Sequence, residues 1–265
     1  MNSTTIPMWQ RNTSVLALAI TALMLLGGCS ASNKPSDEDQ IKRAKLHYQL
    51  GLDALNKNRL PKAFEEFMLA EEIDPNQPDV LEMLGYAWRV RGDLDKAEAY
   101  YKRAIRAGGG SRAMNNYGNL LIQMKKFKEA KIQLKKALED PRYRNQFMAY
   151  INLGDAYLGL NQFDEAIRTY RIAGSFSIKQ TLSRIKEAEA HVAYNQLNYA
   201  QALYEEMFKE DPTDRAVIDG LVNVLKLQND RTTARQYLAK FLEQPSVSKT
   251  DRAWATDAMM KLNRP

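Results

Sequence analysis

The chain has 265 residues and a formal net charge of +6, with 38 Lys and Arg against 32 Asp and Glu. This modest charge is spread along the chain, which argues against a basic arm or tail for nucleic acid. The single cysteine excludes an intramolecular disulfide. Gly and Pro are few, and Ala, Leu, Lys and Glu are abundant. No sustained alternation of apolar and polar residues indicates strands, so the sequence predicts an all-α fold.

Residues 1–28 have the pattern of a secretory signal peptide. Arg11 supplies a positive charge before the apolar segment. Residues 15–26 form this segment, which is too short for a membrane-spanning helix of roughly 20 residues. The segment ends in Leu26-Gly27-Gly28-Cys29, which resembles the bacterial lipobox. Two alternatives are that Cys29 is a buried bystander and that the ordinary signal peptidase cuts nearby.

The lipobox resemblance implies that the chain is cut before Cys29 and that this cysteine is then acylated. Ser30 follows it, whereas an Asp there would resemble the signal for retention in the inner membrane. The resemblance therefore implies a lipid anchor in the outer membrane, with the protein on the periplasmic face. Residues 29–40 are polar and are predicted to form a lipidated, flexible tether, with Ser36 to Asp39 placed to cap the first helix.

The rest of the chain repeats one helical pair. A small Ala opens the second helix of each pair, and the successive intervals are 34, 33, 36, 34 and 34 residues; the marks are Ala63, Ala97, Ala130, Ala166, Ala200 and Ala234. A Leu-Gly or Tyr-Gly pair precedes the first four marks, at Leu50-Gly51, Leu84-Gly85, Tyr117-Gly118 and Leu153-Gly154. This ladder resembles the 34-residue tetratricopeptide repeat.

The resemblance predicts a solenoid of six helix-turn-helix repeats over residues 41–246. Residues 247–265 are predicted to form a capping helix that presents Trp254, Ala258 and Leu262 on one face. Ala188 and Val222 stand where the fifth and sixth repeats should carry Gly, and the frame of the fifth repeat is the least regular.

No catalytic, metal or cofactor site is indicated. The two histidines, His47 and His191, are isolated in the sequence and are interpreted as structural residues. The glycine run at 108–110 lacks the strand and the Gly-Lys-Ser/Thr sequence of a phosphate loop. The lysines at 125–136 alternate with apolar residues, as on the solvated face of a helix. We therefore expect no enzyme, no cofactor, no nucleic-acid partner and no small-molecule substrate.

Repeat arrays of this kind bind a peptide or helix of a partner on the concave surface. In the first unit, Tyr48, Leu52 and Leu55 would form an apolar patch there, and Tyr86 and Arg89 follow in the second unit. These five residues are the predicted partner-binding site. The alternative is that the first three pack on the tether or widen the core. Asn115, Asn119 and Asn152 partly resemble the carboxylate clamp of chaperone-binding repeats, but its basic residues are missing apart from Lys186.

A lipobox, a short tether and six repeats together resemble the type IV pilus lipoproteins known as PilF/PilW-type pilotins. The stretches HYQLGLDALNKNRLPKAFEEFMLAEEIDPN and NLGDAYLGLNQFDEAIRTY carry this resemblance. It implies that the repeats bind the pilus secretin subunit and promote its localisation and multimerisation in the outer membrane, which pilus biogenesis and twitching motility require. One alternative is a periplasmic repeat lipoprotein that serves cell-wall synthesis or outer-membrane protein assembly. Another is an accessory or degradative lipoprotein with a cryptic enzymatic activity.

Overall fold

The computed structural model describes residues 37–176 and 180–262, and these residues contain helices and no strand. The predicted signal peptide, Cys29 and the start of the tether lie outside the described residues. The helices are α2 (Asp37–Asn56), α3 (Leu60–Ile73), α4 (Pro78–Val90), α5 (Leu94–Arg106), α6 (Gly110–Gln123), α7 (Phe127–Leu138), α8 (Gln146–Gly159), α9 (Phe163–Ser175), α10 (Thr181–Ala193), α11 (Leu197–Glu210), α12 (Arg215–Leu227), α13 (Arg231–Glu243) and α14 (Lys249–Leu262).

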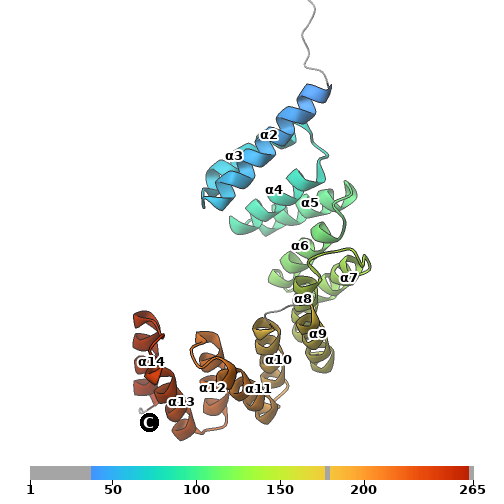
Figure 1. The fold of residues 1–265 in the computed structure, drawn as a ribbon. Coiled ribbons are helices and arrows are strands. Elements are labelled where there is room, and N and C mark those ends of the chain that lie inside the picture. Colours follow the sequence, from blue (N-terminus) through green and yellow to red (C-terminus); the bar gives the residue numbers. More distant parts are fainter. Residues whose placement is uncertain (1–36, 177–179, 263–265) are drawn as a thin grey trace, which may run out of the picture.

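The helices form six consecutive pairs, from α2–α3 to α12–α13, followed by α14 (Figure 1). Each pair packs on the next, and the first helices of successive pairs also contact one another from α4 through α6, α8 and α10 to α12. These first helices therefore make up the inner layer of a curved array. The predicted all-helical solenoid of six repeats with a final capping helix is confirmed.

One residue in the turn of every pair has a left-handed backbone. Asn58, Gly92, Lys125, Asn161, Asn195 and Asn229 all have φ between 56° and 86°. Their spacing equals that of the six Ala marks, because each turn lies five residues before its mark. Asn and Gly tolerate this conformation far better than other residues, so the turn chemistry explains why the first helix of most pairs ends where it does.

Close helix packing explains both small positions of the repeat. All six Ala marks are fully buried. A Cβ added at Gly118 would lie 2.5 Å from Leu134, and one added at Gly154 would lie within 3.0 Å of the Tyr170 ring. The glycine therefore makes room for a bulky side chain of the partner helix, which fills the core of the pair.

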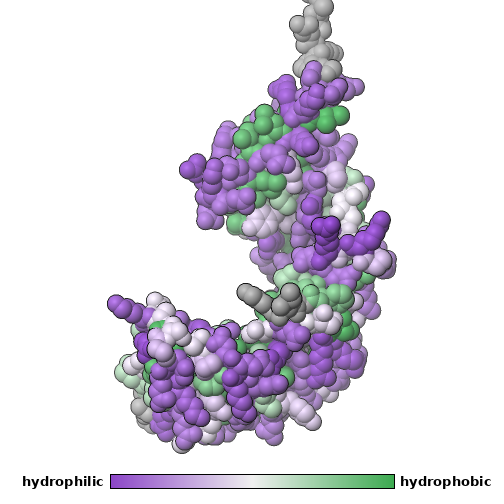
Figure 2. All heavy atoms as spheres, in the orientation of Figure 1, coloured by the Kyte–Doolittle hydropathy of each residue, from purple (hydrophilic) through white to green (hydrophobic). Residues whose placement is uncertain are grey.

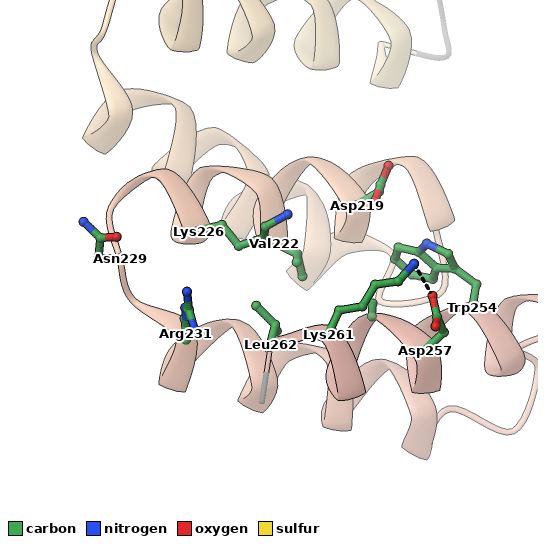
Figure 3. A pocket seen from close by; sticks show the side chains of 10 residues that line it. Asp219, Val222, Lys226, Asn229, Arg231, Trp254, Asp257, Lys261 and Leu262 are labelled. Atoms are coloured by element: carbon green, nitrogen blue, oxygen red, sulfur yellow. Dashed lines mark ion pairs between the residues drawn. The ribbon is translucent and has the colours of Figure 1, made fainter. Parts of the chain in front are cut away.

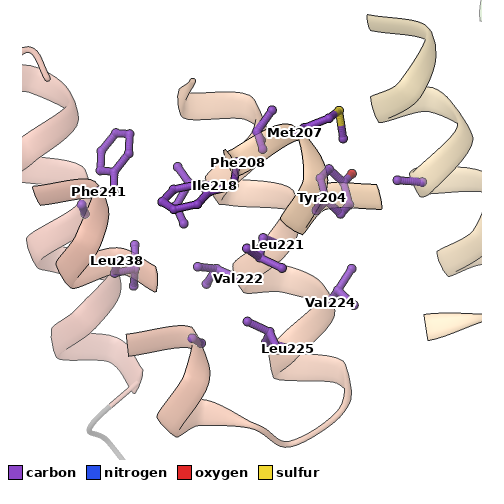
Figure 4. Packing of buried hydrophobic residues seen from close by; sticks show 14 of the residues in the cluster. Tyr204, Met207, Phe208, Ile218, Leu221, Val222, Val224, Leu225, Leu238 and Phe241 are labelled. Atoms are coloured by element: carbon purple, nitrogen blue, oxygen red, sulfur yellow. The ribbon is translucent and has the colours of Figure 1, made fainter. Parts of the chain in front are cut away.

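The largest buried cluster is in the last two repeats and the cap (Figure 4). Val222 is buried there, at the position that holds Gly in the first four repeats, and Leu221 and Phe241 are also buried. From α14, Trp254 packs edge-on against Phe241 with ring centroids 6.1 Å apart, and Leu262 is buried. The final helix thus covers apolar surface that the sixth repeat would otherwise expose.

Two features of the first repeat differ from the predictions. The helix α2 begins at Asp37, so Asp37 to Gln40 lie in its first turn and not in a flexible tether. Three acidic residues in this turn favour such a start because they complement the positive end of the helix dipole. Leu50 was expected in the core ladder but is 43% exposed. The physical reason is that no described element precedes α2 to cover that side.

Candidate protein-binding groove

The concave surface of the array is built from the inner helices. Figure 2 shows the hollow between the first and the last repeats. In each repeat, three residues lie one step around the inner helix from the core, with the same spacing in each unit. In the second to fourth repeats the first of the three is buried, and the other two are partly exposed. In the second, third and fourth repeats they are Glu82, Tyr86 and Arg89; Asn115, Asn119 and Ile122; and Ile151, Asp155 and Leu158.

A buried carboxylate joins the second repeat to the third. The Glu82 residue on α4 is fully buried, and Arg112 on α6 donates from Nε to its Oε2 at 2.8 Å. Asn116, also on α6, donates from Nδ2 to the other carboxylate oxygen at 2.8 Å. Arg112 additionally forms an ion pair with Asp79 on α4. Because both oxygens of the buried carboxylate have partners, the groove floor is rigid at this point.

Asparagine side chains continue this network into the fourth repeat. Asn152 on α8 donates to Oδ1 of Asn115 at 2.9 Å and accepts from Nδ2 of Asn119 at 3.2 Å. The guanidinium of Arg89 on α4 donates to Oδ1 of Asn119 at 3.3 Å. Asn115 and Asn152 are each 4% exposed. These amides therefore bond to one another across two repeats, and Arg89 extends the network to the second repeat, so that α4, α6 and α8 are held in register.

The electrostatics of the groove follow from burial. Burial raises the pKa of Glu82, and the hydrogen bonds from Arg112 and Asn116 only partly oppose this effect. The carboxylate form thus depends on Arg112 for its stability. In the fourth repeat, Asp155 accepts a hydrogen bond from the Tyr170 hydroxyl at 2.7 Å and lies 3.6 Å from Lys186.

The structure separates the predicted site residues into two groups. Tyr48, Leu52 and Leu55 are partly buried and pack against the core of the first pair, where the Tyr48 ring lies 6.1 Å from that of Phe67. The pKa of Tyr48 is raised first by burial and then by the charge of Asp79 on α4. Leu52 and Leu55 widen the core while keeping part of their surface exposed.

Tyr86 and Arg89 lie together on α4. The guanidinium carbon of Arg89 is 5.3 Å from the centre of the Tyr86 ring. Arg89 also bonds Asn119, so it is the link between the predicted site and the asparagine network. Arg89 therefore joins the predicted site to the groove floor, whereas Tyr48 packs on the core of the first pair.

Three residues of the groove were not predicted from the sequence: Arg112, Asp79 and Tyr143. Arg112 follows Glu82 by 30 residues and Asp79 by 33, so opposite charges one repeat apart were the available signal. Tyr143 is in the lengthened connection between α7 and α8, and its pKa is raised first by burial and then by the charge of Glu82. This insertion thus brings a further aromatic residue to the same carboxylate.

The described residues contain no group of three or more His, Cys, Asp and Glu side chains suited to a metal ion. His47 bonds Glu66 at 2.7 Å, and His191 bonds Gln196 at 2.7 Å and stacks on Tyr199. Across residues 37–176 and 180–262, no helix has the length and apolarity needed to cross a bilayer. The groove therefore offers hydrogen bonds, charges and apolar contacts to a partner.

Comparison with known proteins identifies the repeat from which the array is built. A model of the tetratricopeptide repeat matches residues 48–112, and a second model of this repeat matches residues 111–139 and 149–173. The chain is 24% identical over 234 residues to the type IV pilus assembly protein PilF of Pseudomonas aeruginosa. The alignment covers 84% of this chain and 88% of PilF.

Two solved structures share the fold over most of the chain. The structure of Pseudomonas aeruginosa PilF has a TM-score of 0.64 at 20% identity and covers 82% of this chain and 99% of that one. The structure of PilW, described as a widely conserved type IV pilus biogenesis factor, has a TM-score of 0.70 at 17% identity and covers 80% and 97%.

The curved array of helical pairs and the matching repeats define the class: the chain belongs to the tetratricopeptide repeat family. Within this family, it is homologous to PilF of Pseudomonas aeruginosa and structurally similar to PilF and PilW.

Proposed function

We infer that this protein acts in type IV pilus biogenesis as an outer-membrane lipoprotein that binds the pilus secretin and promotes its localisation and multimerisation. The observation that carries this proposal is the likeness to PilF, which extends over 84% of this chain and 88% of PilF. Such coverage extends over several repeats and not only one. The protein would thus be an adaptor without a catalytic role of its own.

The lipid anchor is the first part of the proposed mechanism. Acylation of Cys29 would fix the chain in the membrane, since each buried methylene contributes about 0.8 kcal/mol. Seven residues lie between Cys29 and the start of α2 at Asp37. At about 3.5 Å per residue, the eight steps along the chain from Cys29 to Asp37 would allow the array to start at most ~28 Å from the anchor. The secretin subunit would therefore be held close to the outer membrane.

The groove is the second part. Tyr48, Leu52 and Leu55 keep exposed apolar surface beside the α4 carboxylates, and Tyr86 and Arg89 extend this surface along α4. A secretin segment with an apolar side chain and a hydrogen-bonding backbone would suit this combination. The two signals have separate tasks, because the lipid determines the membrane and the groove selects the cargo.

The primary test follows heat-resistant secretin multimers by immunoblot after membrane fractionation. The strains would carry a gene deletion, the wild-type gene or Cys29→Ala. We expect multimers to be lost in the deletion, and to form poorly or in the wrong membrane with Cys29→Ala. If the deletion leaves the amount and location of multimers unchanged, the secretin role is wrong, and a scaffold for cell-wall or outer-membrane assembly becomes the better explanation.

A second test addresses the groove. Replacing Tyr48, Leu52, Leu55 and Tyr86 together by Ser or Ala should abolish secretin binding in a pull-down, while circular dichroism verifies that the helices remain. A matched control is the double variant Ile132→Ser and Ile172→Ser, which removes exposed apolar side chains from the outer helices α7 and α9. Equal binding by a folded four-residue variant would disprove the assignment of these residues.

A further inference from the structure

A cavity separates the inner helix of the sixth repeat from the capping helix. It has a volume of about 350 Å³ and lies between α12 and α14. Its apolar wall includes Val222, Trp254 and Leu262. The Arg215 guanidinium lies 3.5 Å from the centre of the Trp254 ring and thus fixes this wall. Figure 3 shows Asp219 and Trp254 at one end of the cavity and Arg231 at the other.

A second cavity of about 360 Å³ adjoins the first on the other side of α12. Ile185 from α10 and Tyr204 from α11 contribute to its walls. Both cavities are lined by Asp219, Val222 and Lys226. These three residues form a stripe of α12 between the two hollows, in which Asp219 and Lys226 are exposed and Val222 is buried. Each hollow has a size for bulky side chains of a larger partner.

The two charges of this stripe have no partner in the described part of the chain. Asp219 and Lys226 are both exposed, and neither side chain takes part in a hydrogen bond or ion pair there. They are seven residues apart, which corresponds to two helical turns and about 10 Å along the axis. Lys261, on the facing helix, is already paired with Asp257 at 2.6 Å. The stripe therefore offers one free anion and one free cation on either side of Val222.

The same pair in the second repeat is fully engaged. Asp219 and Lys226 occupy the positions of Glu82 and Arg89 in the repeat register. Glu82 has partners for both oxygens, and Arg89 bonds Asn119. Internal partners therefore use these positions near the start of the array and leave them unused near its end.

We propose that the stripe of Asp219, Val222 and Lys226, together with the cavity under the capping helix, binds an amphipathic helix of a partner protein. This helix presents a bulky apolar side chain between a basic and an acidic side chain two turns apart. The basic group pairs with Asp219, the acidic group pairs with Lys226, and the apolar side chain enters the cavity beside Val222 and Trp254. The site goes beyond the proposed secretin function, because it is at the opposite end of the array from Tyr48.

The test uses three fluorescein-labelled helical peptides of 15 residues with an alanine-based sequence. The first carries a central Leu with an Arg and a Glu seven residues apart around it. The second replaces that Leu by Ser, and the third replaces the Glu by a second Arg. Fluorescence anisotropy would be measured against the purified full chain at low salt. We expect the first peptide to bind at least about tenfold more tightly than each of the other two.

A charge reversal then locates the site. Lys226→Glu should weaken the first peptide about tenfold and strengthen the third by a similar factor, because two anions then flank Val222. The control Lys209→Glu makes the same charge change on the outer helix α11, and should leave both affinities unchanged. Circular dichroism would verify the fold of each variant. The proposal is overturned if the three peptides bind the wild type alike, or if Lys226→Glu has no larger effect than the control.

Discussion

The second and the sixth repeats carry an acidic and a basic residue at the same two positions of their inner helices, yet the surroundings differ. Around Glu82 and Arg89, the third repeat supplies Arg112, Asn116 and Asn119 from α6, and both charges are bonded. Next to Asp219 and Lys226, the neighbour on the inner side is the capping helix α14. Its Lys261 bonds Asp257 on the same helix. The same local pattern thus makes a rigid floor in one region and an open cavity in the other.

This comparison teaches that the following repeat decides what an inner-helix charge does. A side chain on the concave face reaches its counterpart only if the helix stacked upon it presents one at the right height. In the N-terminal half, charges therefore contribute to stability. In the sixth repeat, Arg215 still pairs with Asp251 of the cap, whereas Asp219 and Lys226 remain available for a partner.

The largest difference in stability between the two regions is expected when the partner of Glu82 is removed. We expect Arg112→Ala to reduce the free energy of unfolding by about 3 kcal/mol at pH 7, the lower end for a broken buried ion pair, because Arg112 is half exposed. The cost should shrink toward pH 5, since the unpaired carboxyl has a raised pKa and takes up a proton. Lys226→Ala should change stability by less than about 0.5 kcal/mol. Urea unfolding would measure both, and equal effects would contradict the distinction between the two halves.

The next largest effect concerns Glu98 on α5. Burial alone would raise its pKa, but hydrogen bonds from Lys102, Lys126 and Tyr117 lower the pKa to about 2. A carboxyl with a lowered folded pKa stabilises the fold above its ordinary pKa near 4.5, and this contribution is lost as the pH falls toward 2. We expect Glu98→Gln to cost about 2 kcal/mol at pH 7 and very little at pH 2.

Hydrogen exchange would place this effect in the molecule. Between pH 5 and pH 3, amides of α5 and α6 in the wild type should lose protection before those of α12 and α13. The glutamine variant should remove this order. A uniform loss of protection along the array would show that Glu98 does not control its acid stability.

The two halves of the array also differ at the position that holds Gly in the first four repeats. A Cβ at residue 154 would clash with the Tyr170 ring, so Gly154→Ala should destabilise the chain by about 1.5 kcal/mol despite the better helix propensity of Ala. At Gly85, the nearest atom of Tyr101 would be 3.0 Å from the Cβ, and the same change should cost less. The fifth and sixth repeats already bury Ala188 and Val222 at this position. Thermal unfolding would rank the variants, and a neutral Gly154→Ala would refute the close-packing argument.

The smallest expected effect is in the turn of the third repeat. Lys125 has φ of 58°, whereas four of the other five repeats place Asn at this position. Lys125→Asn should therefore stabilise the chain by about 0.5 kcal/mol, because Asn adopts the left-handed conformation at lower cost. Chemical unfolding of this variant beside Lys128→Asn, an exposed control inside α7, would show whether the gain is specific to the turn.

The helical pairs, their number and the capping role of the last helix could be predicted from the sequence alone. These features depend on residues a few positions apart: the small Ala marks, the Leu-Gly pairs and the apolar face with Trp254 and Leu262. Helix geometry makes such spacing directly readable, since side chains three and four residues apart share a face. The five predicted binding residues lie on the inner helices α2 and α4, and their division between core and groove was not evident from the sequence.

The contacts between side chains of different repeats became evident only from the tertiary structure. The bonds between Asn115 and Asn152 and between Glu82 and Arg112 join residues 37 and 30 positions apart, so no single helix specifies them. Leu50 is exposed because α2 has no described neighbour on that side, although its sequence matches the buried ladder. The cavity beside Val222 likewise depends on how α14 packs against the sixth repeat. These contacts follow from the stacking of one repeat on the next, which local periodicity does not contain.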